Sequence, residues 1–313
     1  MSPQPAHAHS VKAVLDACLR APDEAVLAVI AHTEGPSYRP IGAMMALLAD
    51  GDRVGALSSG CIEADLALHA ADVVRTGRPA MVRYGLGSPY LDIQLPCGGA
   101  LEVLLVPSPD PGVLSGIVER HGARHTSTLA VNVKTGAMSV EFSGETGRVG
   151  ARLLVRIEPE LRFLVFGKGP EASAFSSLVQ SIGYPNLLLA PDEETLDHGR
   201  AAGCETRYMT APVFPDDLAV DDRTAILLFF HDHDWEPPIL EDALGMPAFY
   251  VGAQGSRRAS ETRLSELDAL GIGKAAQARL KGPIGLIPSA RDARTLAVSV
   301  LAEVLVAAMA KAE

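Results

Sequence analysis

Hydrophobic and polar residues along the first half of the chain predict a mixture of helices and short strands. Residues 11–20 have apolar positions at helical spacing, and residues 25–31 form the short apolar run typical of a buried strand. Two more apolar runs, 43–49 and 53–57, flank Asp50-Gly51-Asp52, and Asp-Gly between apolar runs predicts a β-hairpin. The same reasoning predicts later helices at 63–75 and 111–121, and strands at 80–84, 100–106, 128–133 and 137–142.

The second half has a different pattern, in which continuous apolar runs alternate with helices. These runs lack the alternation of a half-exposed strand and predict strands buried on both faces of a parallel sheet, at 162–166, 186–190, 225–230 and 248–251. Helices are predicted at 174–182, 260–270 and 292–310. Apolar residues surround most of the last helix, which predicts packing in the core or at a homodimer interface.

These patterns predict an α/β protein of two domains. We expect an N-terminal α/β domain over residues 1–158 and a C-terminal Rossmann-like domain, a doubly wound parallel sheet, over residues 159–313, with Glu158-Pro159-Glu160 at the boundary. The length of 313 residues agrees with two domains, because one hydrophobic core usually stops growing at about 250 to 300 residues.

Charge and cysteine content narrow the class of protein. A net charge of −11 argues against a general nucleic-acid or anionic-membrane binder, because phosphate backbones select basic surfaces. No signal peptide is recognisable, and the apolar run at 296–309 is interrupted by Ser299 and Glu303 and is too short to span a bilayer, so a cytoplasmic protein is expected. The cysteines form no C-x-x-C pair, which favours reduced thiols over disulfides or structural zinc; they are Cys18, Cys61, Cys97 and Cys204.

The first candidate for chemistry is the run Ser58-Ser59-Gly60-Cys61-Ile62-Glu63, which precedes the amphipathic helix at 63–75. A cysteine at a strand-to-helix turn lies where backbone N–H groups and the helix dipole favour a thiolate or a bound anion. The alternative is a cysteine that packs as a small hydrophobic residue at the start of the helix.

Two further loops in this half carry candidate residues. Cys97-Gly98-Gly99 contains a double glycine that allows close approach of backbone, so Cys97 is a possible partner of Cys61. Arg39 lies in the loop from Gly35 to Gly42, from which it could reach an anion; the alternative is an ion pair with a nearby carboxylate.

The second half begins with a possible dinucleotide site. A predicted strand leads into Gly167-Lys168-Gly169-Pro170-Glu171-Ala172 and a helix, which is the setting of the dinucleotide-binding fingerprint, and Asp192 follows the next strand where a ribose-binding carboxylate is expected. Glu171 opposes this interpretation, because it would stand close to the pyrophosphate. Plain packing of strand against helix is the alternative.

Two later loops follow predicted strands at the edge where open α/β sheets bind ligands. His231 comes directly after the apolar run 225–230, which suits contact with an anion or a pterin better than a metal, since alternate residues of an extended segment face opposite ways. Gly255-Ser256-Arg257-Arg258 precedes a helix and predicts a local phosphate pocket. The alternative there is a surface arginine pair beside a serine N-cap.

Taken together, these motifs resemble the XdhC/CoxI family of molybdenum-hydroxylase maturation factors. The matching residues cover nearly the whole chain and include Ser37, Arg39-Pro40, Gly60-Cys61-x-Glu63, Cys97-Gly98-Gly99, Gly167-x-Gly169, His231 and the run from Phe249 to Arg258. The chain departs from the family's pattern at Gly169-Pro170 and at residues 287–291, around the expected second-domain pocket.

The resemblance implies a cytoplasmic accessory protein rather than a turnover enzyme. Such a protein binds molybdenum cofactor, protects it while a cysteine desulfurase supplies sulfur, and passes it to an apo molybdenum hydroxylase such as xanthine dehydrogenase. Arg39, Arg257 and Arg258 suit the cofactor's phosphate, whereas Cys61 and Cys97 suit its soft metal or a persulfide. Two alternatives remain open: an NAD(P)-dependent oxidoreductase with His231 as proton donor, and a sulfurtransferase that uses both cysteines.

Overall fold

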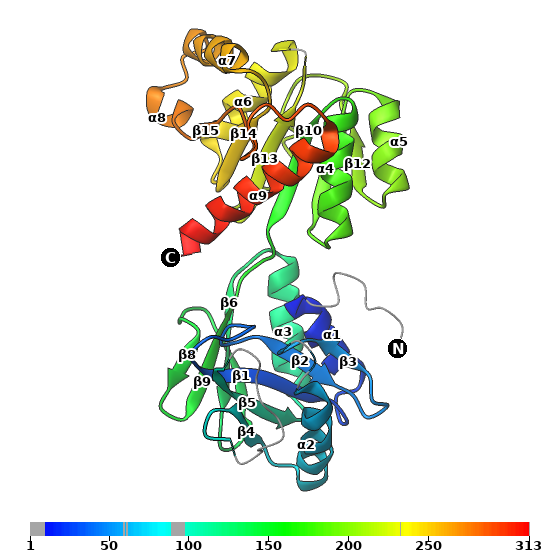
Figure 1. The fold of residues 1–313 in the computed structure, drawn as a ribbon, viewed down its shortest axis with the longest axis vertical. Coiled ribbons are helices and arrows are strands. Elements are labelled where there is room, and N and C mark those ends of the chain that lie inside the picture. Colours follow the sequence, from blue (N-terminus) through cyan, green and yellow to red (C-terminus); the bar gives the residue numbers. More distant parts are fainter. Residues whose placement is uncertain (1–9, 59, 61, 89–97, 232, 313) are drawn as a thin grey trace. The chain divides into compact units, whose positions relative to one another are not determined.

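The computed structural model describes residues 10–58, 60, 62–88, 98–231 and 233–312. The chain divides into two compact units, residues 1–159 and 160–313 (Figure 1). Each unit has its own sheets and its own hydrophobic cores.

The first unit is built on an antiparallel five-stranded sheet, in the order β3 (Arg53–Gly55), β2 (Met44–Leu47), β1 (Val26–Glu34), β5 (Ala100–Pro107), β4 (Ala80–Gly85). Alternate residues of β1 face opposite cores, as the period of two in a strand requires. Leu27 and Val29 pack with α1 (Val11–Arg20) and α3 (Pro111–Gly122), whereas Ala28 and Ile30 pack with α2 (Glu63–Thr76). The central strand is therefore covered on both faces.

A second, four-stranded antiparallel sheet completes this unit, in the order β7 (Met138–Glu141), β6 (Ser127–Asn132), β9 (Arg152–Ile157), β8 (Gly147–Val149). Its buried residues, among them Leu129 and Val155, join the core that contains α1 and α3. The pattern of apolar residues predicted β6 and β7 but left residues 144–156 without an assignment. This segment contains β8, which is short and mostly exposed, and most of β9, which is largely buried.

The second unit contains a parallel six-stranded sheet. Its order is β12 (Glu205–Tyr208), β11 (Asn186–Ala190), β10 (Arg162–Gly167), β13 (Thr224–Phe229), β14 (Tyr250–Ala253), β15 (Leu280–Lys281). If β10 to β15 are numbered 1 to 6, the order is 3-2-1-4-5-6, which is that of a doubly wound Rossmann fold. The strand order reverses between β10 and β13. The predicted fold class is confirmed.

Helices cover both faces of this sheet. The helices α4 (Pro170–Ser181), α5 (Glu193–Ala201) and α9 (Ala293–Ala312) share one core with Phe163 and Val165 of β10. The helices α6 (Glu236–Gly245) and α7 (Arg257–Ala269) share the other core with Leu164 and Phe166. The remaining short helices are η2 (His233–Trp235) and α8 (Lys274–Gln277).

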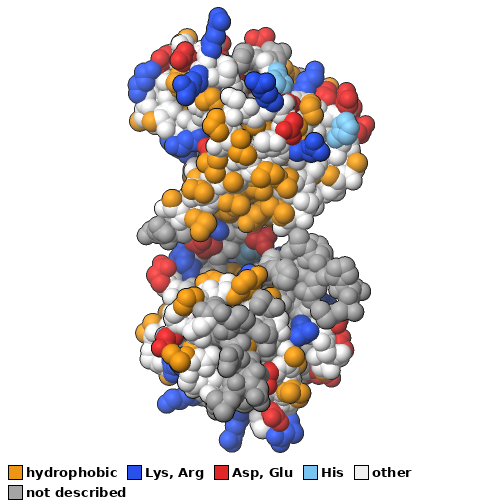
Figure 2. All heavy atoms as spheres, in the orientation of Figure 1, with side chains coloured by type: hydrophobic (Ala, Val, Ile, Leu, Met, Phe, Trp, Pro, Cys, Tyr) orange, Lys and Arg blue, Asp and Glu red, His pale blue; other side chains and the backbone are white. Residues whose placement is uncertain are grey.

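The last helix, α9, is apolar on two faces. Ala297, Val300 and Val304 are buried against the sheet, whereas Val306 and Met309 are 59% and 71% exposed. Figure 2 shows hydrophobic side chains gathered on the surface where Figure 1 draws α9. The predicted packing in the core therefore holds for one face only.

Among the described residues, α9 is the one helix whose length and composition would let it cross a membrane. Its segment Ala293–Ala310 has a mean hydropathy of 1.7 and is 28% buried. The prediction that the apolar run is too short to span a bilayer concerned residues 296–309, and the helix extends beyond them at both ends. Its buried face packs as that of a core helix does.

Candidate cofactor-binding sites

Three connections that carry predicted site residues leave the same end of the five-stranded sheet. At this end β1 finishes at Glu34 and β5 begins at Ala100, and these two residues are register partners. Gly85, the last residue of β4, pairs with the same Ala100, and Gly55, the last residue of β3, pairs with the second residue of β2. The antiparallel order therefore places the connections that contain Arg39, Gly60 and Gly98 at the same end of the sheet.

Two of these connections touch through glycine. A Cβ atom added to Gly99 would lie 2.2 Å from the carbonyl oxygen of Pro36 and 2.8 Å from that of Glu34. Only glycine can occupy position 99 without moving backbone, and Gly98 has a φ of 72°, a conformation that favours glycine. The loop that begins at Gly35 therefore rests directly on Gly99.

The connection that contains Gly60 is organised by Glu63, the first residue of α2. The N–H groups of Leu57 and Ser58 donate to Glu63 Oε1 at 3.3 and 2.8 Å. The Ser58 hydroxyl and the Ile62 N–H donate to Oε2 at 2.8 and 3.2 Å. Gly60, with φ at 101°, adds an N–H donated to Ser58 Oγ at 3.3 Å. Ser58 and Glu63 thus determine the shape of this loop.

The Glu63 carboxylate is 5% exposed and ionised. Burial raises its pKa, but the hydrogen bonds from Ser58, from the Glu63 backbone and from Ile62 outweigh burial and hold the pKa below its usual value. An internal carboxylate therefore takes the N–H groups of Leu57, Ser58 and Ile62 that the sequence interpretation left open for a thiolate or an external anion. The loop is therefore held by the Glu63 carboxylate, and these three backbone N–H groups are not available to a ligand.

Arg39 supplies positive charge at the same end of the sheet. Its Nε atom is buried and has no hydrogen-bond partner among the described residues, and its backbone carbonyl accepts a hydrogen bond from Ser37 Oγ at 2.7 Å. A buried guanidinium donor without a partner is costly unless something else binds it. This feature suits an anionic group such as a phosphate.

The cysteines divide into two kinds. Cys61 and Cys97 lie outside the described residues. Cys18 and Cys204 are buried, and burial raises the pKa of the Cys18 thiol to about 12 and also raises that of Cys204. The last two thiols therefore stay neutral and pack as small apolar groups.

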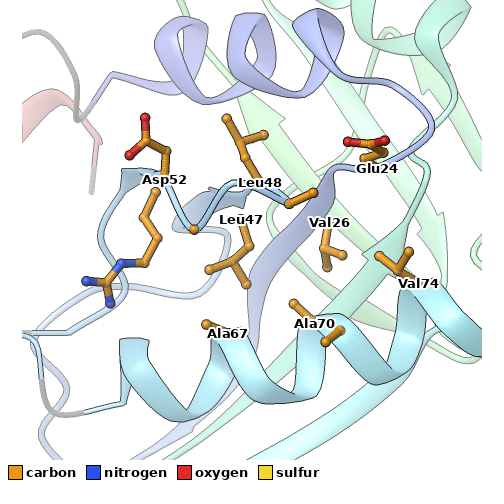
Figure 3. Close-up of a pocket in the computed structure, with 12 residues that line it drawn as sticks. Glu24, Val26, Leu47, Leu48, Asp52, Ala67, Ala70 and Val74 are labelled. Atoms are coloured by element: carbon orange, nitrogen blue, oxygen red, sulfur yellow. The ribbon is translucent and has the colours of Figure 1, made fainter.

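A separate cavity of about 460 Å³ lies at the opposite end of the five-stranded sheet. Figure 3 shows Leu47 and Val26 of the sheet facing Ala67 and Ala70 of α2, with Glu24 and Asp52 at the border. The cavity contains none of the predicted site residues.

In the second unit, the glycine-rich turn after β10 serves packing and helix capping. A Cβ atom on Gly167 would lie 2.8 Å from the Phe229 carbonyl oxygen. The Gly169 N–H donates to Thr195 Oγ1 at 2.8 Å, and the Asp192 carboxylate caps α5 by accepting from the Thr195 N–H and hydroxyl, each at 2.9 Å. The predicted phosphate donor and the predicted ribose-binding carboxylate are therefore both engaged by α5.

Glu171, His231 and Gln254 converge where the strand order changes direction. Glu171 Oε2 is buried, accepts no hydrogen bond among the described residues, and lies 3.4 Å from His231 Nε2. Gln254 Nε2 also lies 3.4 Å from His231 Nε2. Of these three residues, His231 lines a cavity of about 560 Å³, together with Lys168, Gly169, Pro191, Phe230 and Trp235.

The arginine turn lies beside another cavity, of about 670 Å³. Ser256 caps α7 by accepting the Ala259 N–H at 3.1 Å. Gly255, Ser256, Arg257 and Arg291 line this cavity, and its lining residues include no carboxylate. Arg258 is exposed beside it. The structure therefore contains both features that the sequence offered as alternatives, the serine N-cap and a positively charged cavity.

Sequence reasoning missed a buried ion pair between α6 and α7. Arg263 donates to both Glu236 oxygens, at 2.8 and 3.1 Å, and to the Gln254 carbonyl oxygen at 2.8 Å; Arg263 and Glu236 are 0% and 1% exposed. The sequence does contain a sign that Arg263 is buried: it lies four residues before Leu267, so both residues are on the same, buried face of α7. Among the described residues, no group of three His, Cys, Asp or Glu could hold a metal ion.

Comparison with known proteins agrees with these features. Residues 18–85 match the XdhC and CoxI family, and residues 163–304 match the XdhC Rossmann domain. The molybdenum cofactor insertion chaperone PaoD of Escherichia coli is 34% identical over 90% of this chain and 82% of its own. A probable xanthine dehydrogenase subunit of Bacillus subtilis is 24% identical over 93% of this chain and 96% of its own.

A solved structure shares the whole fold. A crystal structure described as a xanthine dehydrogenase from Bacillus halodurans superposes with a TM-score of 0.80, covers 96% of both chains and is 22% identical. The resemblance inferred from the motifs is thus confirmed across both units, and the chain belongs to the XdhC/CoxI family.

Proposed function

We propose that this protein binds molybdenum cofactor, supports its sulfuration and inserts it into an apo molybdenum hydroxylase. The similarity to a molybdenum cofactor insertion chaperone extends through both units and supports this proposal most directly. The cofactor is the cargo of such a protein, so retention and release matter more than turnover.

The observation that carries the proposal is the shared sheet end in the first unit. The connections of Arg39, Gly60 and Gly98 lie at this end, and the Arg39 Nε donor has no described partner. The Arg39 guanidinium would bind the anionic part of the cofactor, and Cys61 or Cys97 would supply a thiolate to its soft metal or carry sulfur. Glu63 would hold the loop in shape while cargo enters and leaves.

The second unit has a candidate phosphate site of its own. Arg257, Arg258 and Arg291 give a local positive region in a chain of net charge −11, which suits a phosphate. NAD(P) is a weaker candidate here, because Gly169 and Asp192 are engaged by α5 and Glu171 would oppose pyrophosphate.

The partners that fit this function are an apo hydroxylase and a cysteine desulfurase, in the cytoplasm. The exposed apolar face of α9 would be the interface of a homodimer, because a large exposed apolar patch marks an interaction surface.

The test measures molybdenum and pterin bound to the purified chain after anaerobic incubation with molybdenum cofactor. Wild type should retain both, and Cys61→Ala should lose most of them. Cys204→Ala is the matched control, since Cys204 is a buried structural thiol of the second unit. Equal retention by wild type and Cys61→Ala would remove Cys61 from the site, and no retention by any variant would overturn the proposed function.

A further inference from the structure

Arg83 of β4 connects three neighbouring strands at the sheet end that carries the candidate site of the first unit. Its Nη1 donates to Glu102 Oε1 at 3.1 Å, and Glu102 is its register partner on β5. Its Nη2 reaches past β5 and donates to Glu34 Oε2 on β1, at 2.8 Å. Glu34 is the last residue of β1, so this contact fixes the point at which the loop of Arg39 begins.

The third donor of the same guanidinium holds the turn that follows β4. Arg83 Nε donates to the Leu86 carbonyl oxygen at 3.0 Å, and the Arg83 carbonyl oxygen accepts from Ser88 Oγ at 2.8 Å. The turn packs against the guanidinium, since a Cβ atom on Gly87 would lie 3.5 Å from Arg83 Nε. This turn begins the connection that leads to Gly98.

Backbone contacts join this turn to the loop that follows β1. The Leu86 N–H donates to the Gly99 carbonyl oxygen at 3.4 Å. The Pro36 carbonyl oxygen lies so close to Gly99 that a Cβ atom there would be 2.2 Å from it. Arg83 is therefore bound to the base of both connections, through Glu34 at one and Leu86 at the other.

A contribution to stability does not account for this arrangement. The side chains of Arg83, Glu34 and Glu102 are 30%, 54% and 23% exposed, and ion pairs this accessible contribute little to folding. A simple cross-strand pair would need Glu102 alone. A lysine would supply the same charge, whereas the planar fork of arginine holds three acceptors in one geometry.

We propose that Arg83 is a positioning residue of the first-unit site. It holds the loop of Arg39 and the connection of Gly98 in one relative position, so that the groups on both meet a ligand in a single geometry. Its Nε, Nη1 and Nη2 atoms are each engaged within the protein, so Arg83 acts through the two connections rather than on the ligand. The identity of the ligand, molybdenum cofactor, rests on the proposed function.

The first experiment measures how fast the full-length protein releases molybdenum cofactor. Protein loaded anaerobically is transferred to buffer without cofactor, and the molybdenum and pterin that stay bound are followed over time. Arg83→Gln and Arg83→Lys should both release cofactor about tenfold faster than wild type, because neither side chain holds three acceptors at once. Arg152→Gln is the matched control and should release like wild type, because Arg152 pairs with Glu141 across the other sheet of the same unit.

Two further measurements separate positioning from folding. Urea unfolding of Arg83→Gln should have its midpoint within about 0.5 M of wild type, since the ion pairs are exposed. Hydrogen exchange of the Leu86 amide needs no cofactor; it should be about tenfold faster in Arg83→Gln and unchanged in Arg152→Gln.

The outcomes distinguish this inference from the proposed function. Retention by wild type with unchanged release by Arg83→Gln, or with wild-type release by Arg83→Lys, would overturn the positioning role and leave the function standing. A large loss of urea stability in Arg83→Gln would reduce Arg83 to a structural residue and overturn the role as well. No retention by wild type would overturn the proposed function, and the Leu86 exchange would then decide: faster exchange in Arg83→Gln supports positioning of the two connections, and unchanged exchange overturns it.

Discussion

At the scale of single residues, the first unit shows how one buried carboxylate can shape a functional loop. Glu63 accepts hydrogen bonds from both sides of Gly60, so backbone on either side of the cysteine position is held by one side chain. The motif around Cys61 could be recognised from the sequence, but this arrangement could not. Whether an acidic residue at the start of a helix faces solvent or folds back on the preceding loop depends on burial, which one sequence does not reveal.

Replacing Glu63 by glutamine should destabilise the first unit. The amide nitrogen of the new side chain would face an N–H or hydroxyl donor that now meets a carboxylate oxygen, and a buried donor left unpaired costs about 1 to 3 kcal/mol. Urea unfolding followed by circular dichroism measures the loss. Glu145→Gln, at an exposed position of the same unit, is the control and should change the free energy of unfolding by less than about 0.5 kcal/mol. Equal stability of the two variants would show that Glu63 does not hold the loop.

The same carboxylate should make stability depend on pH in a defined direction. Because the pKa of Glu63 is lower in the folded protein than in the unfolded chain, its contribution is complete above the unfolded value of about 4.3 and is lost as pH falls through the folded value. The stability difference between wild type and Glu63→Gln should therefore be constant from about pH 6 to 8 and shrink below about pH 4. A difference that stays constant down to about pH 3 would contradict a lowered pKa.

At the scale of elements, the central strands of the parallel sheet were predicted, but its edge strands β12 and β15 were not. Strands β10, β11 and β13 are buried on both faces, and their continuous apolar runs define them. β8 is a short, mostly exposed strand, and no periodicity marks it. The convergence of Glu171, His231 and Gln254 depends on the strand order 3-2-1-4-5-6, which motifs suggest only indirectly.

The ion pair that joins α6 and α7 should be a major stabilising contact of the second unit. Arg263→Met would remove both hydrogen bonds that the buried Glu236 carboxylate accepts from Arg263, and breaking a fully buried pair costs about 3 to 5 kcal/mol. Arg263→Met/Glu236→Leu, which removes both charges, should recover a large part of this loss. Thermal unfolding of the two single variants and the double variant gives the coupling energy. Additive losses would show that the two side chains do not act as a pair.

At the scale of the whole molecule, charge is distributed so that anions can bind only locally. The chain carries a net charge of −11, yet Arg39 in one unit and Arg257 with Arg291 in the other stand at candidate sites. Long-range attraction of polyanions is therefore weak, and selection must come from the shape and hydrogen bonds of each site. The net charge predicted that the protein would not bind polyanions in general. It did not predict that Arg39 Nε would be a buried donor without a described partner.

The whole protein should consequently bind nicotinamide dinucleotides poorly in spite of its Rossmann fold. The Gly169 N–H already donates to Thr195, the Asp192 carboxylate caps α5, and Glu171 places negative charge where pyrophosphate would lie. We expect NADH and NADPH to bind wild type with a Kd weaker than about 1 mM, measured by calorimetry and by energy transfer from Trp235. Glu171→Gln should strengthen NADH binding, because it removes the repulsion and leaves the fold unchanged. Micromolar binding of NADH by wild type would contradict this account and assign the second unit to a dinucleotide.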